Sequence, residues 1–350
     1  MHTKQFLLIA FLMLAGLYTR RALAQSFENA GQYIDHINQA NNKVSSIYLS
    51  YLSAVGHNKS ARKVEKRRQE VVESIFNTRL QIQGMPPWKG DRTYRDTTVM
   101  YMKLLYNVFN EDYAKIVNME EIAEQSYDAM EAYMLAQEKA SEKLAAASDR
   151  HEQSQRDFAA RNNIKLVNNT SELAQKSRIA AQLMDHYNDI YLIFFKAYKQ
   201  ESYLMDALSK KGITAIEQNR VSLKQFAEEG LQKLKKEHGY NNDPTLIVAC
   251  RNLLNFYKAE AAETEHATAF FLKEEAFNKI KKSFNTKPAA QRTQQDIDAY
   301  NKGVADINAA VNSYNGTNNQ LNRNRAQVLN DWDNAVKKYL DTYMPMQRRG

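Results

Sequence analysis

The sequence is poor in residues that cross-link or interrupt a chain. It contains one cysteine, Cys250, so no disulfide can form within the chain and packing alone must stabilise the fold. Its five prolines stand at positions 86, 87, 244, 288 and 345, and the stretch from 88 to 243 has none. Because a proline inside a helix costs about 3 kcal/mol, this spacing permits very long helices.

Long apolar runs and strand patterns are also scarce. After residue 24 the longest wholly apolar stretch is 190–195 (IYLIFF), whereas a helix that crosses a bilayer needs about 20 apolar residues. The sequence shows no sustained alternation of apolar and polar residues, which would mark a half-buried strand. With 43% hydrophobic and 25% charged residues, the composition is that of a folded protein. These features predict an all-α protein with no transmembrane segment in the mature chain.

The first 24 residues predict a signal peptide. An apolar run of 13 residues (6–18, FLLIAFLMLAGLY) is too short to span a membrane, and Ala-Leu-Ala at 22–24 fits the site of a signal peptidase. We expect cleavage between Ala24 and Gln25; two arginines between the run and this site leave an uncleaved anchor as the alternative. The chain is therefore expected to be exported, to the periplasm, to the outer-membrane surface or as a secreted protein.

Helical periodicity is the strongest positive signal. Apolar residues recur at alternating spacings of three and four in the stretches 34–55, 173–208 and 300–339, and Glu201 and Arg325 are among the residues that interrupt them. Such stripes predict antiparallel helical bundles, and at 1.5 Å per residue the longest helices predict an elongated particle. The expected helices lie near 27–56, 60–83, 93–117, 119–162, 170–210, 214–237, 244–286 and 291–343.

The first four expected helices resemble the last four, which predicts an internal duplication. Ile-Tyr-Leu at 47–49 corresponds to Ile-Tyr-Leu at 190–192, and Gly90 corresponds to Gly239 at an offset of 149 residues. An asparagine-rich stretch at 162–169 separates the two groups. We therefore expect two tandem four-helix modules, at 25–165 and 166–350.

Motifs for catalysis and for metal binding are missing. The sequence has no Gly-x-Ser-x-Gly, no His-Glu-x-x-His and no glycine-rich phosphate loop. Glu263 and His266 have the Glu-x-x-His spacing of di-metal bundles, but no second copy supplies the remaining ligands. Cys250 falls at a core-facing position and is expected to be a small buried residue. We expect a protein that is not an enzyme and that has no metal or cofactor.

Basic residues are densest at the start of the second expected helix. A cluster of this kind can bind acidic glycans or lipid headgroups, but it is more often a solvated helix face, which is the interpretation that we favour. Nucleic acid is not expected as a partner because the protein leaves the cytoplasm. The candidate interaction residues of this cluster are Lys59, Arg62, Lys63, Lys66 and Arg67, and Arg68 follows them.

The turn at 86–89 is the most distinctive loop. Loops often carry function and an exposed tryptophan suits contacts with sugars or proteins, so Pro86, Pro87, Trp88 and Lys89 are candidate contact residues. Alternatively, Trp88 fills the end of the first bundle, and we favour this second interpretation.

Several of these features together resemble a family of helical surface proteins of spirochaetes and Bacteroidetes whose function is unknown. The features are the export signal, the tyrosine-rich first helix around Ile47-Tyr48-Leu49, the Pro86-Pro87-Trp88 turn and the duplicated helical tail. The resemblance implies a location in the cell envelope and a helical fold. It implies no active-site residues.

The sequence is most consistent with a non-enzymatic envelope protein that serves as a scaffold, a spacer or an adhesin-like interaction module. Its expected partner is a protein or a glycan of the cell envelope. A membrane-active, pore-forming type of helical protein is the alternative, and the shortness of the apolar run at 190–195 argues against it. A metal-binding bundle is the least favoured hypothesis.

Overall fold

The computed structural model describes residues 27–56, 60–166 and 172–345. The predicted signal peptide at 1–24, the cleavage site between Ala24 and Gln25, and the basic residue Lys59 lie outside the described residues. Within the described ranges the chain forms helices and turns without a strand, which confirms the all-α prediction. In this part of the chain, no helix is long and apolar enough to cross a membrane.

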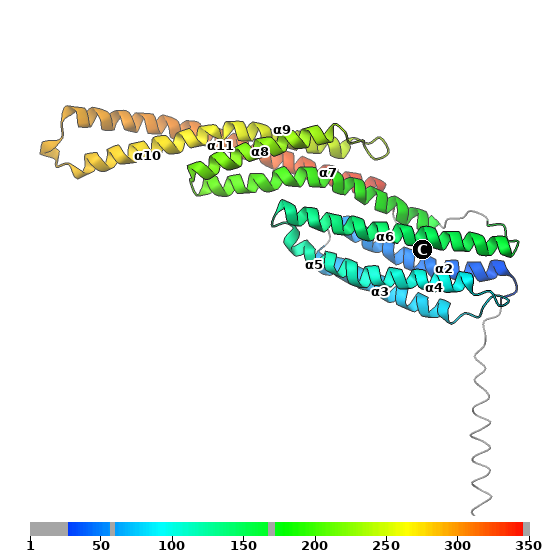
Figure 1. Ribbon diagram of the computed structural model, residues 1–350. Coiled ribbons are helices and arrows are strands. Elements are labelled where there is room, and N and C mark those ends of the chain that lie inside the picture. Colours follow the sequence, from blue (N-terminus) through cyan, green and yellow to red (C-terminus); the bar gives the residue numbers. More distant parts are fainter. Residues whose placement is uncertain (1–26, 57–59, 167–171, 346–350) are drawn as a thin grey trace, which may run out of the picture.

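The first half of the chain forms an antiparallel bundle (Figure 1). The helices are α2 (Ala30–Gly56), α3 (Ala61–Gln83), α4 (Thr93–Asn107), α5 (Tyr113–Ala123) and α6 (Tyr127–Arg161). A π-helical segment, Val108–Asp112, joins α4 to α5, so these two helices act as one bent rod. The helix expected at 119–162 begins only at Tyr127, because Ser126 caps it by accepting a hydrogen bond from the backbone N–H of Ala129.

The π-helical segment has a partner on a neighbouring helix. Arg68 of α3 is buried, and its Nη1 donates a hydrogen bond of 2.7 Å to the carbonyl oxygen of Phe109. Its Nε and Nη2 donate to the carboxylate of Glu65, which balances the charge of the guanidinium. Arg68 therefore belongs to the interior of the bundle, where it satisfies a carbonyl group that the irregular turn leaves open.

The second half contains the longer helices. They are α7 (Glu172–Ser209), α8 (Ile213–Leu234), α9 (Thr245–Glu263), α10 (Glu265–Thr286) and α11 (Gln294–Tyr343). The single helix expected at 244–286 is interrupted at Thr264, whose hydroxyl donates to the carbonyl of Glu260 at 2.7 Å. Such a bond to the preceding turn bends helices, so α9 and α10 are two segments of one rod.

The distal parts of α10 and α11 form an arm that extends past the other helices (Figure 1). Tyr314 stacks on Phe270 with the ring centroids 4.6 Å apart, and Tyr300 stacks on Phe284 at 4.4 Å. A short 3₁₀ turn, Ala289–Gln291, closes the tip. The arm is a two-helix hairpin held by one aromatic seam.

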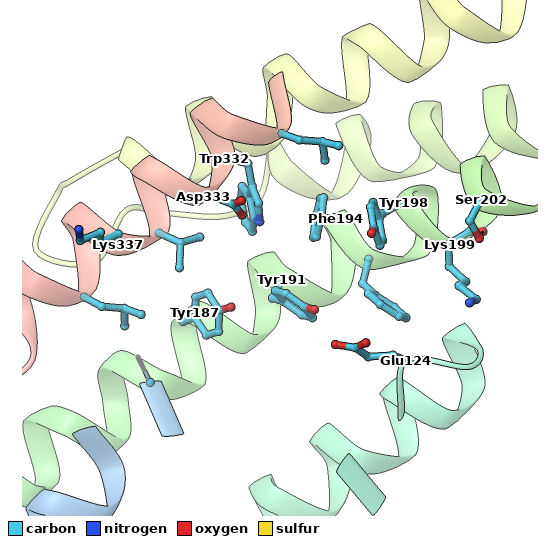
Figure 2. A pocket seen from close by; sticks show the side chains of 15 residues that line it. Glu124, Tyr187, Tyr191, Phe194, Tyr198, Lys199, Ser202, Trp332, Asp333 and Lys337 are labelled. Atoms are coloured by element: carbon cyan, nitrogen blue, oxygen red, sulfur yellow. Dashed lines mark hydrogen bonds between the residues drawn. The ribbon is translucent and has the colours of Figure 1, made fainter. Parts of the chain in front are cut away.

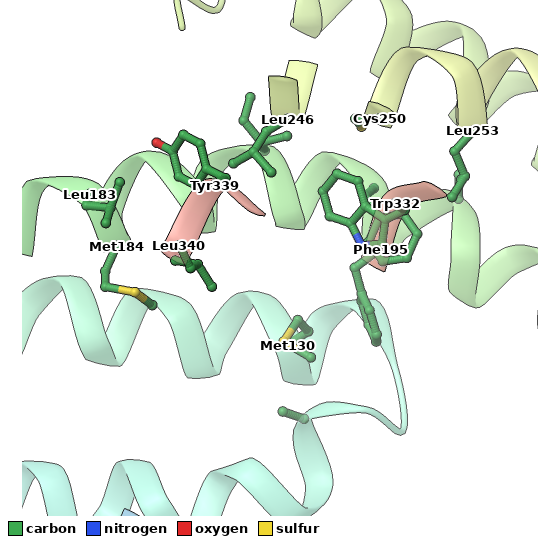
Figure 3. Packing of buried hydrophobic residues seen from close by; sticks show 14 of the residues in the cluster. Met130, Leu183, Met184, Phe195, Leu246, Cys250, Leu253, Trp332, Tyr339 and Leu340 are labelled. Atoms are coloured by element: carbon green, nitrogen blue, oxygen red, sulfur yellow. The ribbon is translucent and has the colours of Figure 1, made fainter. Parts of the chain in front are cut away.

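The two halves share a hydrophobic core. One cluster of buried residues includes Met130 of α6, Phe195 of α7 and Trp332 of α11, which lie close together (Figure 3). A second cluster, with Tyr33, Trp88 and Phe158, fills the far end of the first bundle. The halves are therefore packed against each other across the first cluster.

Each half contains the same tight turn before its third helix. The backbone groups of Trp88 and Asp91 exchange two hydrogen bonds of 2.9 and 2.8 Å, and Tyr240 and Asp243 form the corresponding bridge. The two residues between them have positive φ in both turns: 47° and 88° at 89 and 90, 50° and 64° at 241 and 242. This is the backbone of a type I′ turn.

The two turns correct the alignment of the halves. Gly90 occupies the second central position of the first turn, and the structural counterpart of that position is Asn242. The pairing of Gly90 with Gly239 is therefore wrong, and the offset between the turns is 152 residues. Gly239 has a separate reason to be glycine, since a Cβ there would lie 2.2 Å from the carbonyl oxygen of Asp243.

Candidate functional site

The structure places Trp88 in the interior, which confirms the favoured interpretation of the loop. Its side chain is 8% exposed, and its Nε1 donates a hydrogen bond of 2.9 Å to Oδ1 of Asn162. The hydroxyl of Tyr33 donates to the carbonyl of Pro86 at 3.0 Å and holds the loop on the bundle. Pro86 is half-buried, whereas Pro87 and Lys89 are exposed. The buried ring of Trp88 between them is not accessible to a partner.

The basic cluster on α3 is divided between surface and interior. Arg62, Lys63 and Lys66 are exposed, whereas Arg68 is buried. Arg67 forms an ion pair of 2.6 Å with Glu70, which offsets its charge. Of the cluster residues that the structure describes, three are exposed cations within two turns of α3, and the remaining two are paired with Glu70 and Glu65.

The candidate metal and thiol residues do not form a reactive site. Glu263 and His266 are exposed, with 3.9 Å between Oε2 and Nε2. Within the described ranges, no group of three or more His, Cys, Asp and Glu side chains is arranged to hold a metal ion. Cys250 is fully buried, as expected, and burial raises the pKa of its thiol.

A groove of about 750 Å³ lies between α7 and α11, where the second half meets the first (Figure 2). Its α7 wall has an aromatic residue on each successive turn, and its α11 wall contributes Trp332 and Asp333. Gly56 and Glu124 of the first half close one side. We call this site the aromatic groove, and its α7 wall consists of Tyr187, Tyr191, Phe194, Phe195, Tyr198, Lys199 and Ser202.

Helical periodicity produces both walls. Tyr187, Tyr191, Phe194 and Tyr198 are spaced four, three and four residues apart, so they lie on one face of α7. The α11 wall repeats the pattern from Leu329 to Leu340. One edge of each apolar stripe on α7 and α11 therefore packs in the core, and the other edge lines the groove.

The aromatic rings of the groove support one another. Phe194 stacks on Trp332 with the ring centroids 4.6 Å apart, and Tyr198 stacks on Phe194 at 5.3 Å. Phe194 and Trp332 are buried and form the floor, whereas Tyr198 is 37% exposed at the rim. Because these rings are fixed by packing, the groove keeps its shape without a ligand.

The polar groups of the groove are few and balanced in charge. Glu124 and Asp333 are exposed, and neither has an ion-pair partner among the described residues. Lys199 and Lys337 supply two positive charges, so the formal charges of the lining cancel. Burial, together with the nearby Glu124 carboxylate, raises the pKa of Tyr191 to about 12, so its phenol stays protonated.

The sequence contains a signal that points to this site. Buried helical seams are usually aliphatic, yet the stretch 187–198 places a tyrosine or phenylalanine on every turn of one face. One of the two tryptophans in the chain, Trp332, faces this stretch. Tyrosine combines a flat apolar ring with a polar tip, so an all-aromatic face suits a surface that is partly open to water.

No known protein family, curated protein or solved structure matches this chain.

Proposed function

We propose that the protein is an exported, non-catalytic interaction module of the cell envelope, and that the aromatic groove binds its ligand. One observation carries this proposal: the groove combines a floor of stacked aromatic rings with two carboxylates. These carboxylates, of Glu124 and Asp333, have no ion-pair partner among the described residues. Groups of this kind are available to a ligand without first breaking a contact within the protein.

The size and the lining of the groove support binding. Ligand sites typically enclose about 300–1,000 Å³ and combine apolar walls with a few polar groups. The aromatic groove falls in this range at about 750 Å³. Its polar groups lie on three different segments, α7, α11 and the end of α5, which favours recognition of a defined ligand.

The arm supports the scaffold or spacer part of the proposal. α11 has 50 residues, and its first part leaves the bundle together with α10. A two-helix hairpin of this kind places its tip far from the groove, and it does so without a separate hydrophobic core. The predicted signal peptide is the basis for placing the module outside the cytoplasm.

We also propose that the two halves of the chain are copies of one helical unit. At the offset of 152 residues, four buried positions of α4 coincide with four buried positions of α9. The Asp-x-Thr that ends each turn also coincides, and in both copies the Asp accepts a hydrogen bond of 2.8 Å from the Thr backbone. The coinciding buried pairs are Tyr94 with Leu246, Thr98 with Cys250, Met102 with Leu254 and Leu105 with Tyr257.

Capture from an envelope extract of the producing cells tests the binding function. The immobilised mature protein should retain a component that the Tyr198→Ala and Asp333→Asn variants retain poorly. Phe76→Ala is the control, because Phe76 is an aromatic residue of α3 that is 40% exposed and does not line the groove. Equal capture by all variants would contradict a binding role of the groove.

Protease treatment of intact cells tests the location. Cleavage of the chain without lysis is expected for an outer-membrane surface protein, and protection until the outer membrane is opened is expected for a periplasmic one. Recovery of the chain in the cytoplasmic fraction would contradict export.

A further inference from the structure

We propose that the ligand of the aromatic groove is a neutral oligosaccharide, a chain of uncharged hexose or N-acetylhexosamine units. This inference rests on the proposed function and adds the chemical class of the ligand. Three properties of the lining lead to it: the flatness of its apolar surface, the cancellation of its charges and the distribution of its hydrogen-bonding groups.

Most of the apolar side chains that line the groove are flat rings, and the aliphatic ones, Leu329, Val336 and Leu340, are confined to α11. Phe194 and Trp332 are buried and stack on each other at 4.6 Å, so they support the wall from behind. The rings that a ligand can reach are those of Tyr187 and Tyr191, which are half-buried, and Tyr198, which is exposed. A pyranose ring presents a flat face of C–H groups that packs well on such rings. A helical peptide instead needs pockets that accept aliphatic anchors at several turns, and a wall of packed aromatic rings offers few of these.

The charge of the lining favours a ligand without net charge. The carboxylates of Glu124 and Asp333 are matched by the ammonium groups of Lys199 and Lys337. A polyanion such as a sulfated glycan or a nucleic acid needs an excess of cations, and a cationic ligand needs an excess of carboxylates. The groove has neither excess.

The hydrogen-bonding groups are suited to hydroxyls. The carboxylates of Glu124 and Asp333 accept hydrogen bonds, the two lysines donate, and the hydroxyl of Tyr198 does both. The hydroxyl of Ser202 donates to the carbonyl of Lys199 at 2.7 Å, so towards a ligand it is an acceptor. A sugar carries hydroxyl groups around the edge of each ring, and each can donate and accept. Polar groups spaced along aromatic walls therefore match a chain of such rings.

The two-tryptophan composition provides a direct binding measurement. Trp88→Phe leaves Trp332 as the only indole, so its fluorescence reports on the groove floor. Titration with the tetrasaccharides of N-acetylglucosamine, glucose and mannose is expected to give a saturable change for at least one of them. Dextran sulfate should give none at physiological salt.

Variants then locate the binding site. Tyr198→Ala should weaken the binding of that oligosaccharide by about three- to tenfold, as expected for the loss of one ring contact, and Asp333→Asn should weaken it as well. Phe76→Ala, which changes an exposed ring of α3 outside the groove, should bind like the parent protein. Binding that is unaffected by both groove variants would overturn the assignment.

Treatment of the envelope extract with periodate or protease distinguishes the oligosaccharide proposal from the proposed binding function on which it rests. If groove-dependent capture is lost after periodate oxidation of the extract and survives protease, the ligand is a glycan. If it survives periodate and is lost after protease, the oligosaccharide proposal is wrong while the binding function stands. If no groove-dependent capture occurs and no tetrasaccharide binds, both proposals fail.

Discussion

The side chains of Arg325 and Glu201 form a buried ion pair between α11 and α7, with 2.6 Å between Nε and Oε1. The Nη2 of the same guanidinium contacts the carboxylate of Glu260 on α9, which is fully buried. One cation therefore serves two carboxylates in the interior. The pair also links α7 to α11 at one end of the aromatic groove. Glu201 is adjacent to Ser202, and Arg325 lies one turn before Leu329.

The Glu260 carboxyl should make stability depend on pH. Burial raises its pKa from 4.5 to about 7; Arg325 lowers the pKa and Glu201 raises it. Because the folded state binds this proton more tightly than the unfolded state, the free energy of unfolding should fall by about 3 kcal/mol as the pH rises from 4.5 to 8.

Urea denaturation across this pH range measures the effect. In Glu260→Gln the contribution should disappear, and in the control Glu263→Gln, which changes an exposed residue of the same turn, it should remain. Identical pH profiles for the wild type and Glu260→Gln would contradict the prediction.

Removal of the shared cation should destabilise the second half strongly. Arg325→Met leaves two buried carboxylates without a counter-charge, and breaking such a pair costs about 3–5 kcal/mol. Adding Glu260→Gln to this variant should restore part of the loss, because one of the two uncompensated charges is then gone. Arg323→Met, at an exposed position on the same helix, should change the free energy of unfolding by less than about 0.5 kcal/mol.

His151 should remain neutral in the folded first bundle. Burial lowers its pKa from 6.5 to about 4. The hydroxyl of Thr98 donates to the carbonyl of Tyr94 at 2.8 Å, so the Nε2–H of His151 donates to the Thr98 oxygen at 3.0 Å. Because the unfolded chain binds the proton more tightly, this contribution to stability is present above pH 6.5 and is lost as the pH falls towards 4.

Nuclear magnetic resonance of the imidazole nitrogens should show the Nε2–H tautomer of His151 at pH 7 and no protonation at pH 5.5. A ring that becomes charged in the folded protein between these pH values would refute the assignment. The exposed His266 provides a reference signal in the same spectra.

Trp88 should matter for folding and not for ligand binding. Trp88→Ala removes a buried ring and is expected to cost about 3–5 kcal/mol. Trp88→Phe keeps most of the packing and loses the hydrogen bond to Asn162, so a cost of about 1–2 kcal/mol is expected. Thermal denaturation measures both, and a loss of extract capture by correctly folded Trp88→Phe would show that the loop contacts a partner.

The helices could be predicted from sequence because their apolar stripes and proline boundaries are local features. The interruptions could not be predicted, since the turn at Val108–Asp112 depends on Arg68, which comes from another helix. The break at Thr264 could not be predicted from the threonine itself, because Thr98 makes the same hydroxyl-to-carbonyl bond inside α4 without a break.

The aromatic groove was missed for a related reason. Periodicity shows which residues share a face of a helix, but it does not show which part of that face a neighbouring helix covers. Tyr198 and Phe194 belong to the same stripe, yet one lies at the rim and the other in the floor. Glu201 and Arg325 were visible as breaks in two stripes, and only the packed structure pairs them.

The length of α11 has a geometric consequence. One continuous helix runs from Gln294 beside the tip to the groove wall at Trp332, about 57 Å at 1.5 Å per residue. The helix therefore fixes the distance between the tip of the arm and the groove. Removing matching whole turns from α10 and α11 would shorten this distance in steps of about 5.4 Å.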